Sequence, residues 1–372
     1  MNSNMKTIDT RLLTLEEKIG QLFFIGVFGT VLDKRTSQLL SDIRPGGVCL
    51  FARNIKKAEQ TRKLLDEIRE NSKIEPFLSL DQEGGLVDRL RRIVTPMPAA
   101  SDFTKIEDVQ AFGRIVAETI GILGFNFDFA PVVDVVNSNR SNFDNGLRSR
   151  TFGETAEDVI ELAGAFLSQL RSKGILTSLK HFPGLGASGV DSHEELPFVP
   201  INDEGLHEID LVPYRYFMAE NSVDSVMVAH ATYPSTQYQR QDSLGHDIPS
   251  SLSKSFITDL LRNEMGYHGV VITDDLEMGA IVKNYGIGDA CRRAINAGVD
   301  MLAICAGEEN IREGHSAIMR SVENGDISEA RINESVRRIL DLKTHIVQPL
   351  HFDLSRLAEL SVEIEVLKHS LK

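Results

Sequence analysis

The chain has 372 residues, of which 42% are hydrophobic and 25% are charged, with 28 Gly and 12 Pro. This composition is too apolar for a disordered chain and predicts a packed core in one or two domains. The 40 basic and 54 acidic side chains give a net charge of −14, which disfavours nucleic acid and anionic membrane surfaces as partners because their phosphates would be repelled.

The cysteine content and the N-terminal segment indicate the compartment. Cys49, Cys291 and Cys305 are odd in number and widely spaced, so they suit neither a disulfide framework nor a CxxC metal site. The first 18 residues are polar and lack the apolar core of a signal peptide. No run approaches the roughly 20 apolar residues that would span a bilayer. We therefore predict a cytoplasmic protein with no membrane partner.

Eight short apolar runs alternate with amphipathic segments along the chain. In chain order the runs are 22–29, 47–51, 77–81, 125–131, 177–182, 225–230, 269–275 and 301–305. Their near-continuous hydrophobicity is typical of strands that are buried on both faces. Eight alternations favour a (β/α)₈ TIM barrel over a doubly wound sheet, which would need fewer strands and usually a GxGxxG turn that this sequence lacks.

The segments between the runs predict helices. Residues 156–173 place apolar side chains at three-and-four spacing, which gives one stripe that can pack on a sheet. Weaker versions of this pattern begin at Lys57, Ile106, Ser253 and Gly288. No linker or low-complexity tract divides the chain, so residues 1–348 are predicted to form one barrel domain, closed by a helix from Ile327. Residues 349–372 are predicted to be a peripheral C-terminal extension.

Polar residues stand where several predicted strands end. The third strand ends in Asp81, the fifth in Lys180 and His181, the sixth in His230, and the seventh in an Asp-Asp pair. One such residue alone could simply cap a helix or anchor a loop. Because the reactive groups of these barrels lie at the C-terminal ends of the strands, the whole set predicts a site at one mouth.

The loop after the fifth strand, KHFPGLGASGVDSH, carries three glycines ahead of Asp191 and His193. The glycines permit loop motion, and residues two apart on an extended chain project to the same side. A carboxylate beside an imidazole fixes its tautomer and raises its basicity, so His193 could donate a proton and later accept one. The alternative is a solvated loop in which Asp191 caps a turn.

The segment GVVITDDLEMGA places Asp274 and Asp275 at a strand end directly before a predicted helix. Because adjacent strand residues point opposite ways, we expect only one of them to face inward as a candidate nucleophile. Alternation alone does not identify which of the two residues faces inward. The other residue is expected to cap the following helix or to support the site. No HxxxH, HExxH or DxDxDG spacing accompanies the pair, so no metal site is predicted.

The segment LSLDQEGGLVDRL ends a strand at Asp81. The following Gly84-Gly85 lets the loop fold back, so that Arg89 returns toward the mouth. A carboxylate can accept from two adjacent hydroxyls and a guanidinium can donate to them, which suits a sugar. The alternative for Arg89 is a surface ion pair.

Together these segments resemble glycoside hydrolase family 3, and within it the single-domain β-N-acetylhexosaminidases. The resemblance runs in order from QLFFIG near residue 21 through GGVCLFARN, DQEGGLVDRL, FDFAPVVDV, SRTFG, KHFPGLGASGVDSH, VMVAHATYP and GVVITDDLEMGA to about Leu342. It implies a (β/α)₈ fold, no metal or other cofactor, and a retaining mechanism through a covalent glycosyl-enzyme. The implied partner is a small N-acetylglucosaminyl saccharide, such as a muropeptide released during peptidoglycan recycling.

The resemblance also implies roles for individual residues. It makes Asp274 the nucleophile, and His193 with its partner Asp191 the general acid/base. The residues that it assigns to binding of the terminal N-acetylglucosamine are Asp81, Arg89, Arg150 of SRTFG, Lys180 and His181. The sequence departs from the family at Leu185, where the family usually has His, and at Leu86, where it usually has Arg. Both departures bear on the substrate more than on the reaction.

Other functions stay open at the level of sequence. Lys180 could form a Schiff base in an aldolase-like lyase. A relative could transfer the sugar to phosphate in place of water, or could act on β-glucosides. A sugar-binding protein without catalysis is a further alternative, although a binder would need none of Asp191, His193 and Asp274.

Overall fold

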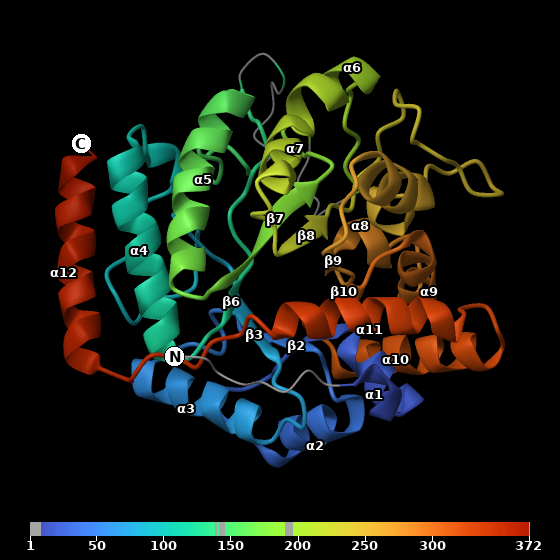
Figure 1. The fold of residues 1–372 in the computed structure, drawn as a ribbon, viewed down its shortest axis with the longest axis horizontal. Helices are drawn as coiled ribbons and strands as arrows, with labels where there is room; N and C mark the ends of the chain where they lie inside the picture. The colour runs from blue at the N-terminus through green and yellow to red at the C-terminus, as the bar shows by residue number, and fades with distance from the viewer. Residues whose placement is uncertain (1–8, 138–139, 141–145, 190–195, 372) are drawn as a thin grey trace.

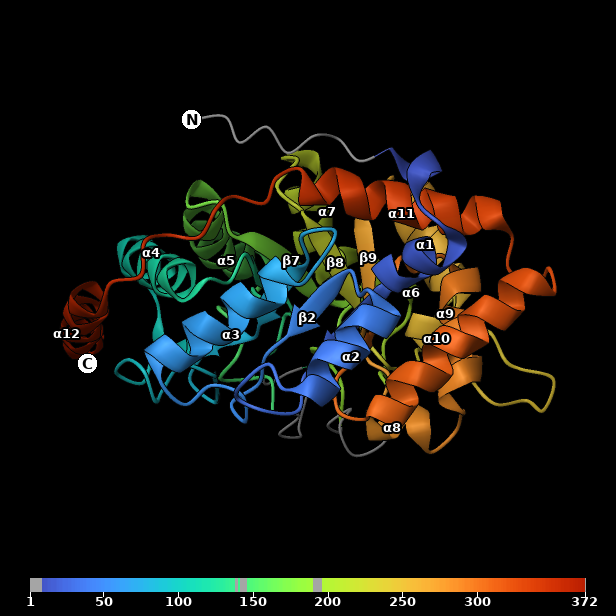
Figure 2. The same cartoon turned by 90° about the horizontal axis from the view of Figure 1, so that it is seen from below.

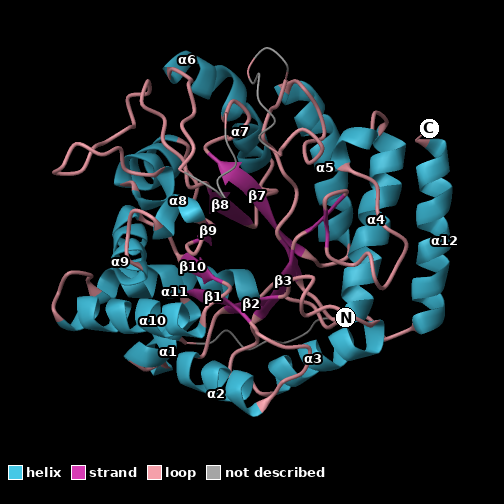
Figure 3. Ribbon diagram, turned by 180° about the vertical axis from the view of Figure 1, so that it is seen from behind, coloured by secondary structure: helices cyan, strands magenta, loops and turns pink. Residues whose placement is uncertain are grey.

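A computed structural model describes residues 9–137, 140, 146–189 and 196–371 of the chain. Parallel strands form a closed barrel at the centre, and helices surround it (Figures 1 and 3). The barrel strands are β1 (Phe23–Gly26), β2 (Gly47–Cys49), β3 (Phe77–Leu80), β6 (Phe127–Asp128), β7 (Leu176–Phe182), β8 (Ser225–Val228), β9 (Val270–Asp275) and β10 (Met301–Ile304). Each falls on one of the eight predicted runs, and the predicted (β/α)₈ barrel is confirmed.

Barrel strands that follow one another in the chain are neighbours, and β10 closes the ring by pairing with β1. Helical segments lie between successive strands, as parallel pairing requires. The α-helices are α1 (Leu15–Gln21), α2 (Lys34–Ile43), α3 (Ala58–Glu70), α4 (Ile106–Leu123), α5 (Ala156–Ser172), α6 (Asp203–Gly205), α7 (Val212–Ala219), α8 (Gly279–Val282), α9 (Ile287–Ala297), α10 (Glu308–Glu323), α11 (Glu329–Lys343) and α12 (Leu354–Ser370). Shorter or wider helical turns are η1 (Thr10–Leu12), η2 (Ala100–Asp102), η3 (Leu206–Asp210), η4 (Ser250–Leu252) and η5 (Ser255–Glu264).

Helix α5 shows how local sequence sets an element. Thr155 accepts a hydrogen bond from the backbone of Asp158, and the Asp158 side chain accepts one from the backbone of Thr155, which forms a capping box. The apolar stripe of the helix is buried, and the helix packs along α4. The other predicted helices begin within two residues of their expected starts.

Phenylalanine rings fill the interior of the barrel. Phe24 of β1 contacts Phe77 of β3, Phe127 of β6 and Phe129, with ring centroids 6.0, 5.8 and 5.1 Å away. All four rings are buried. A side chain at Gly47 would come within 2.4 Å of the Phe24 ring, so this position requires glycine. The cluster makes the barrel a packed core and supplies the floor on which the mouth is built.

Helix α12 lies outside the ring of barrel helices, alongside α4 (Figures 1 and 2). Its buried face consists of Leu357, Leu360, Ile364 and Leu367. Arg356 donates to both carboxylate oxygens of Glu118 on α4, at 2.6 and 2.9 Å. The segment predicted as a peripheral extension therefore forms a helix held by one apolar stripe and by ion pairs.

None of the helices in the described part of the chain combines the length and the apolar character needed to cross a bilayer.

Candidate active site

A cavity of about 220 Å³ lies at the C-terminal ends of the barrel strands. Six of the residues singled out from the sequence line it: Asp81, Arg89, Arg150, Lys180, His181 and Asp274. The other lining residues are Phe24, Cys49, Phe51, Glu83, Val87, Phe129, Met227, Asp275, Met278, Ala303 and Cys305. Convergent charged groups on an apolar floor make this cavity the candidate active site.

Two irregularities in strand pairing bring consecutive side chains to the cavity. From Leu179 to Phe182, β7 advances three residues while β8 advances two, so β7 carries one extra residue at Lys180-His181. Between Ile272 and Asp275, β9 likewise advances three residues against two on β10. An extra residue interrupts the alternation of a strand and re-aims its side chains.

Asp274 and Asp275 accordingly both line the cavity, and the prediction that only one would face inward was wrong. The expectation assumed regular alternation, which the extra residue in β9 breaks.

A network of four charges forms one wall of the cavity. Glu83 receives both an Nε and an Nη2 hydrogen bond from Arg150, at 2.8 and 2.9 Å, and its Oε1 lies 2.5 Å from the Lys180 ammonium. The same ammonium donates to Asp81 at 2.9 Å. Although burial opposes it, the charges of Lys180 and Arg150 hold the pKa of Glu83 below its usual range. Paired in this way, the four side chains are fixed and charged.

Lys180 is buried, and its pKa is nevertheless raised by the two carboxylates. A Schiff-base lysine needs a neutral amine, which burial beside cations can supply. Here the neighbours are Asp81 and Glu83, so the environment favours the ammonium form and disfavours the lyase alternative.

His181 is oriented by a residue of the preceding βα loop. Its Nδ1 lies 2.8 Å from Asp134 Oδ2, and since a carboxylate only accepts, Nδ1 carries the proton. Nε2 then faces Arg150 Nη2 at 3.4 Å. The second Asp134 oxygen accepts from the backbone of Leu185, whose side chain is buried. Leu185 therefore packs in the interior, while its backbone helps to position Asp134.

The hairpin of β4 (Gln82–Gly84) and β5 (Val87–Asp88) returns Arg89 to the mouth, as expected. Gly84 and Gly85 have φ of 89° and 55°, conformations that side chains other than glycine rarely adopt. Arg89 lies 3.3 Å from Asp81 Oδ2, and its buried Nε has no hydrogen-bond acceptor among the described residues. The hairpin tip, Leu86, is 72% exposed.

Asp275, which also lines the cavity, and His230 support the loop after β9 through hydrogen bonds. Asp275 Oδ1 accepts from the backbone of Glu277 at 3.0 Å, and burial raises the pKa of Asp275 to about 7. His230, which was expected at the mouth, is fully buried beneath it. Its Nε2 donates to the Asp275 carbonyl at 3.1 Å and its Nδ1 accepts from Ser251. Both residues therefore fit positioning roles.

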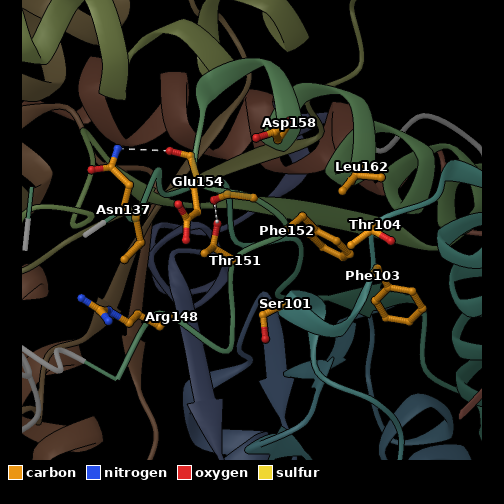
Figure 4. A pocket seen from close by; sticks show the side chains of 12 residues that line it. Ser101, Phe103, Thr104, Asn137, Arg148, Thr151, Phe152, Glu154, Asp158 and Leu162 are labelled. Carbon is orange, nitrogen blue, oxygen red and sulfur yellow. Dashed lines mark hydrogen bonds between the residues drawn. The ribbon is translucent and has the colours of Figure 1, made fainter. Parts of the chain in front are cut away.

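Asp191 and His193 lie outside the described residues. A cavity of about 370 Å³ lies between the loop before α4 and the start of α5 (Figure 4). It is lined by polar and aromatic side chains including Arg148, Phe152 and Glu154. None of the six described candidate residues lines it, so we assign the chemistry to the central cavity.

Sequence reasoning missed Glu83 and Asp134 as members of the site. Both lie within quoted motifs, Glu83 two residues after Asp81 and Asp134 at the end of FDFAPVVD. In both cases, a carboxylate a few residues after a predicted strand was the sequence feature that could have identified the residue. Their partners, Arg150 and His181, come from other segments, and only the closed barrel brings them together.

Comparisons with known proteins agree with this geometry. The glycosyl hydrolase family 3 N-terminal domain matches residues 14–342. Over 318 residues the chain is 34% identical to a β-hexosaminidase of Alkalilimnicola ehrlichii, covering 83% of this chain and 86% of that protein. It is 31% identical over 340 residues to β-hexosaminidase A of Pseudoalteromonas piscicida, and this match covers 86% of the chain but only 56% of that protein.

Among solved structures, a glycoside hydrolase family 3 β-N-acetylglucosaminidase from Paenibacillus sp. superposes with a TM-score of 0.85 at 34% identity. The match covers 95% of this chain and 69% of that one.

Proposed function

This chain belongs to glycosyl hydrolase family 3 and is a glycosidase, and we propose that it removes terminal, non-reducing, β-linked N-acetylglucosamine from small saccharides with retention of configuration. The observation that carries the proposal is the convergence of Asp274 with the charged network around Asp81 and Lys180 in one cavity. The relatives named above, a β-hexosaminidase and a β-N-acetylglucosaminidase, support the choice of sugar.

In the proposed reaction, the ionised carboxylate of Asp274 attacks the anomeric carbon and forms a glycosyl-enzyme. His193, assigned through the family resemblance with Asp191 as its partner, protonates the departing oxygen and then deprotonates the attacking water. After it has donated its proton, the imidazole is neutral, whereas a carboxylic acid would have become a carboxylate. The imidazole therefore repels the anionic nucleophile less than a second carboxylate would.

Binding of the sugar is proposed to use the hydroxyl-binding groups of the cavity wall. Asp81 would accept from the sugar hydroxyls, Lys180, Arg89 and Arg150 would donate to them or orient their neighbours, and the unprotonated Nε2 of His181 would accept. Muropeptides from peptidoglycan recycling are the proposed natural substrates, and the cytoplasmic location stays a prediction from the sequence.

The test compares hydrolysis of p-nitrophenyl N-acetyl-β-glucosaminide and of the plain β-glucoside by the wild type and by Asp274→Ala. We expect activity on the first, little on the second, and a fall in kcat of at least about a thousandfold in the variant, because the covalent route is lost. Asp326→Ala, the same change on the exposed turn after α10, is the control. Equal turnover by Asp274→Ala would remove Asp274 from this role, and sugar 1-phosphate formed in phosphate buffer would indicate phosphorolysis instead.

A further inference from the structure

Three cations gather on two loops beside the active-site cavity: Arg53 and Lys56 on the loop after β2, and Arg92 on the loop after β5. The Lys56 ammonium and an Arg92 guanidinium nitrogen donate to the same carbonyl oxygen, that of Ala52, at 3.5 and 3.1 Å. Arg53 is the next residue along the chain. We name Arg53, Lys56 and Arg92 the mouth cation cluster.

The mouth cation cluster is continuous with the cavity. The Arg53 guanidinium lies 4.5 Å from the ring centroid of Phe51, a residue that lines the cavity. Arg89, inside the cavity, lies 5.7 Å from the same ring centroid. Arg53 also donates to the carbonyl of Cys305, another lining residue. The cluster therefore borders the cavity along the Phe51 edge.

The cluster has no counter-charge in the described part of the chain. No carboxylate there lies within ion-pair distance of Arg53, Lys56 or Arg92, whereas Arg89 and Arg150 inside the cavity are both paired. All three side chains are exposed, and the chain as a whole carries 14 excess negative charges. Lys56 and Arg92, held at one carbonyl oxygen, repel each other, and an anion placed between them would relieve that repulsion.

We propose that the mouth cation cluster binds an oxyanion on the aglycone, so that the preferred substrate carries a carboxylate or phosphate on the residue next to the scissile bond. The proposal rests on the proposed function, because the cavity must hold the terminal sugar for the aglycone to reach this edge. Guanidinium forks and an ammonium are the groups that proteins use for carboxylate and phosphate oxygens.

The first experiment measures kcat/KM for three β-1,4-linked substrates at low salt: N-acetylglucosaminyl-N-acetylmuramic acid, its lactyl amide, and chitobiose 1-phosphate. For the wild type we expect the carboxylate or the phosphate substrate to exceed the neutral amide by about thirtyfold, since each of the three exposed charge contacts contributes about threefold. The ratio should approach one at about 1 M salt, where the Debye length is about 3 Å. A preference for either oxyanion supports the proposal, and a preference for neither overturns it.

Variants assign the preference to the cluster. Lys56→Gln should lower the charged-to-neutral ratio about threefold, and Lys56→Gln combined with Arg92→Gln should lower it about tenfold, which leaves the contribution of Arg53. Arg337→Gln, the same loss of charge on the exposed face of α11, should leave the ratio unchanged. A ratio in the double variant equal to that of the wild type would overturn the assignment.

A binding measurement separates this proposal from the proposed function. Isothermal titration calorimetry with the Asp274→Asn variant measures the affinities for the carboxylate and amide disaccharides without turnover. Tighter binding of the carboxylate, weakened about threefold in the variant that also carries Lys56→Gln, supports the cluster even if the wild type hydrolyses neither disaccharide. Equal affinities would overturn the cluster even if both disaccharides are hydrolysed.

Discussion

Two buried clusters of charge lie at opposite ends of the barrel, and they differ in what their charged groups face. At the mouth, Asp81, Glu83, Lys180 and Arg150 line the active-site cavity. At the other end, Asp300 stands directly before β10 and lines neither of the two cavities described above. Both clusters pair buried carboxylates with cations, but only the cluster at the mouth lines the active-site cavity.

The Asp300 cluster is closed by the protein itself. Arg262 and Arg338 donate to the Asp300 carboxylate at 2.5 and 3.1 Å, and Arg331 donates at 3.3 Å. The Ser335 hydroxyl and a β9 amide add two more hydrogen bonds. Against the effect of burial, these cations lower the pKa of Asp300. Every acceptor site is used, so this cluster can only hold β9, β10 and α11 together.

The network of Asp81, Glu83, Lys180 and Arg150, in contrast, is open to the cavity. Arg89 beside it keeps a buried nitrogen without an acceptor among the described residues, and the carboxylate of Asp81 faces the cavity. A ligand can therefore complete what the protein leaves incomplete. The comparison teaches that a buried ion network indicates a binding site when its bonding capacity is unfilled, and a structural role when that capacity is saturated.

The largest expected effect is on stability, from Asp300→Asn. The change leaves three guanidinium groups without their buried counter-charge, and removing one partner of such a group costs about 3–5 kcal/mol. Urea unfolding should show this loss, while kcat/KM per folded molecule stays at the wild-type value. A loss below about 1 kcal/mol would contradict the structural role of the cluster.

The matching change at the mouth, Glu83→Gln, should act mainly on activity. Gln cannot accept from both Arg150 and Lys180 as a carboxylate does, so both cations lose their fixed positions against the sugar. We expect kcat/KM to fall about a hundredfold, as for other losses of positioning. Steady-state kinetics would show the fall, and circular dichroism would show a folded protein. Wild-type kinetics in a folded variant would remove Glu83 from the site.

The smallest effect concerns Asp128, whose pKa burial raises to about 7. Its Oδ1 accepts from the backbone of Gln82, and its buried Oδ2 has no partner among the described residues. Above the unfolded pKa of about 3.9 the unfolded chain loses this proton, whereas the folded protein keeps it until about pH 7, so stability falls as pH rises between these values.

Asp128→Asn removes this dependence, because the amide resembles the protonated acid. The free energy of unfolding of the variant should therefore rise relative to that of the wild type by about 1.4 kcal/mol per pH unit from pH 4 to 7. Above pH 7 the difference between the two should be constant. Denaturant titrations at pH 5 and 6 measure the difference. A difference that does not change with pH would contradict the raised pKa.

Much of this arrangement could be predicted from the sequence because it depends on local pattern. Strands buried on both faces are continuous apolar runs, and these gave the eight barrel strands. The rule that reactive groups follow strand ends located Asp81, Lys180, His181 and Asp274 at one mouth. Arg150 was reached only through family resemblance, since it stands in a loop with no periodic pattern.

The same reasoning failed where the answer depended on neighbouring strands. Alternation within one strand misplaced the Asp274-Asp275 pair, because the extra residue shows only against the register of β10. His230 was predicted to end its strand at the mouth, whereas β8 ends at Val228 and His230 is buried and donates to the Asp275 carbonyl.

The amino-acid sequence by itself determined the number and order of the strands, the end of the barrel at which chemistry is possible, and the family. Only the tertiary structure decided that Glu83 holds Arg150 and Lys180, that Asp134 orients His181, and that Arg53 contacts Phe51 at the edge of the cavity. The physical reason is that hydrophobic periodicity is a property of each segment. Pairing of charges, in contrast, depends on which segments the closed barrel sets side by side.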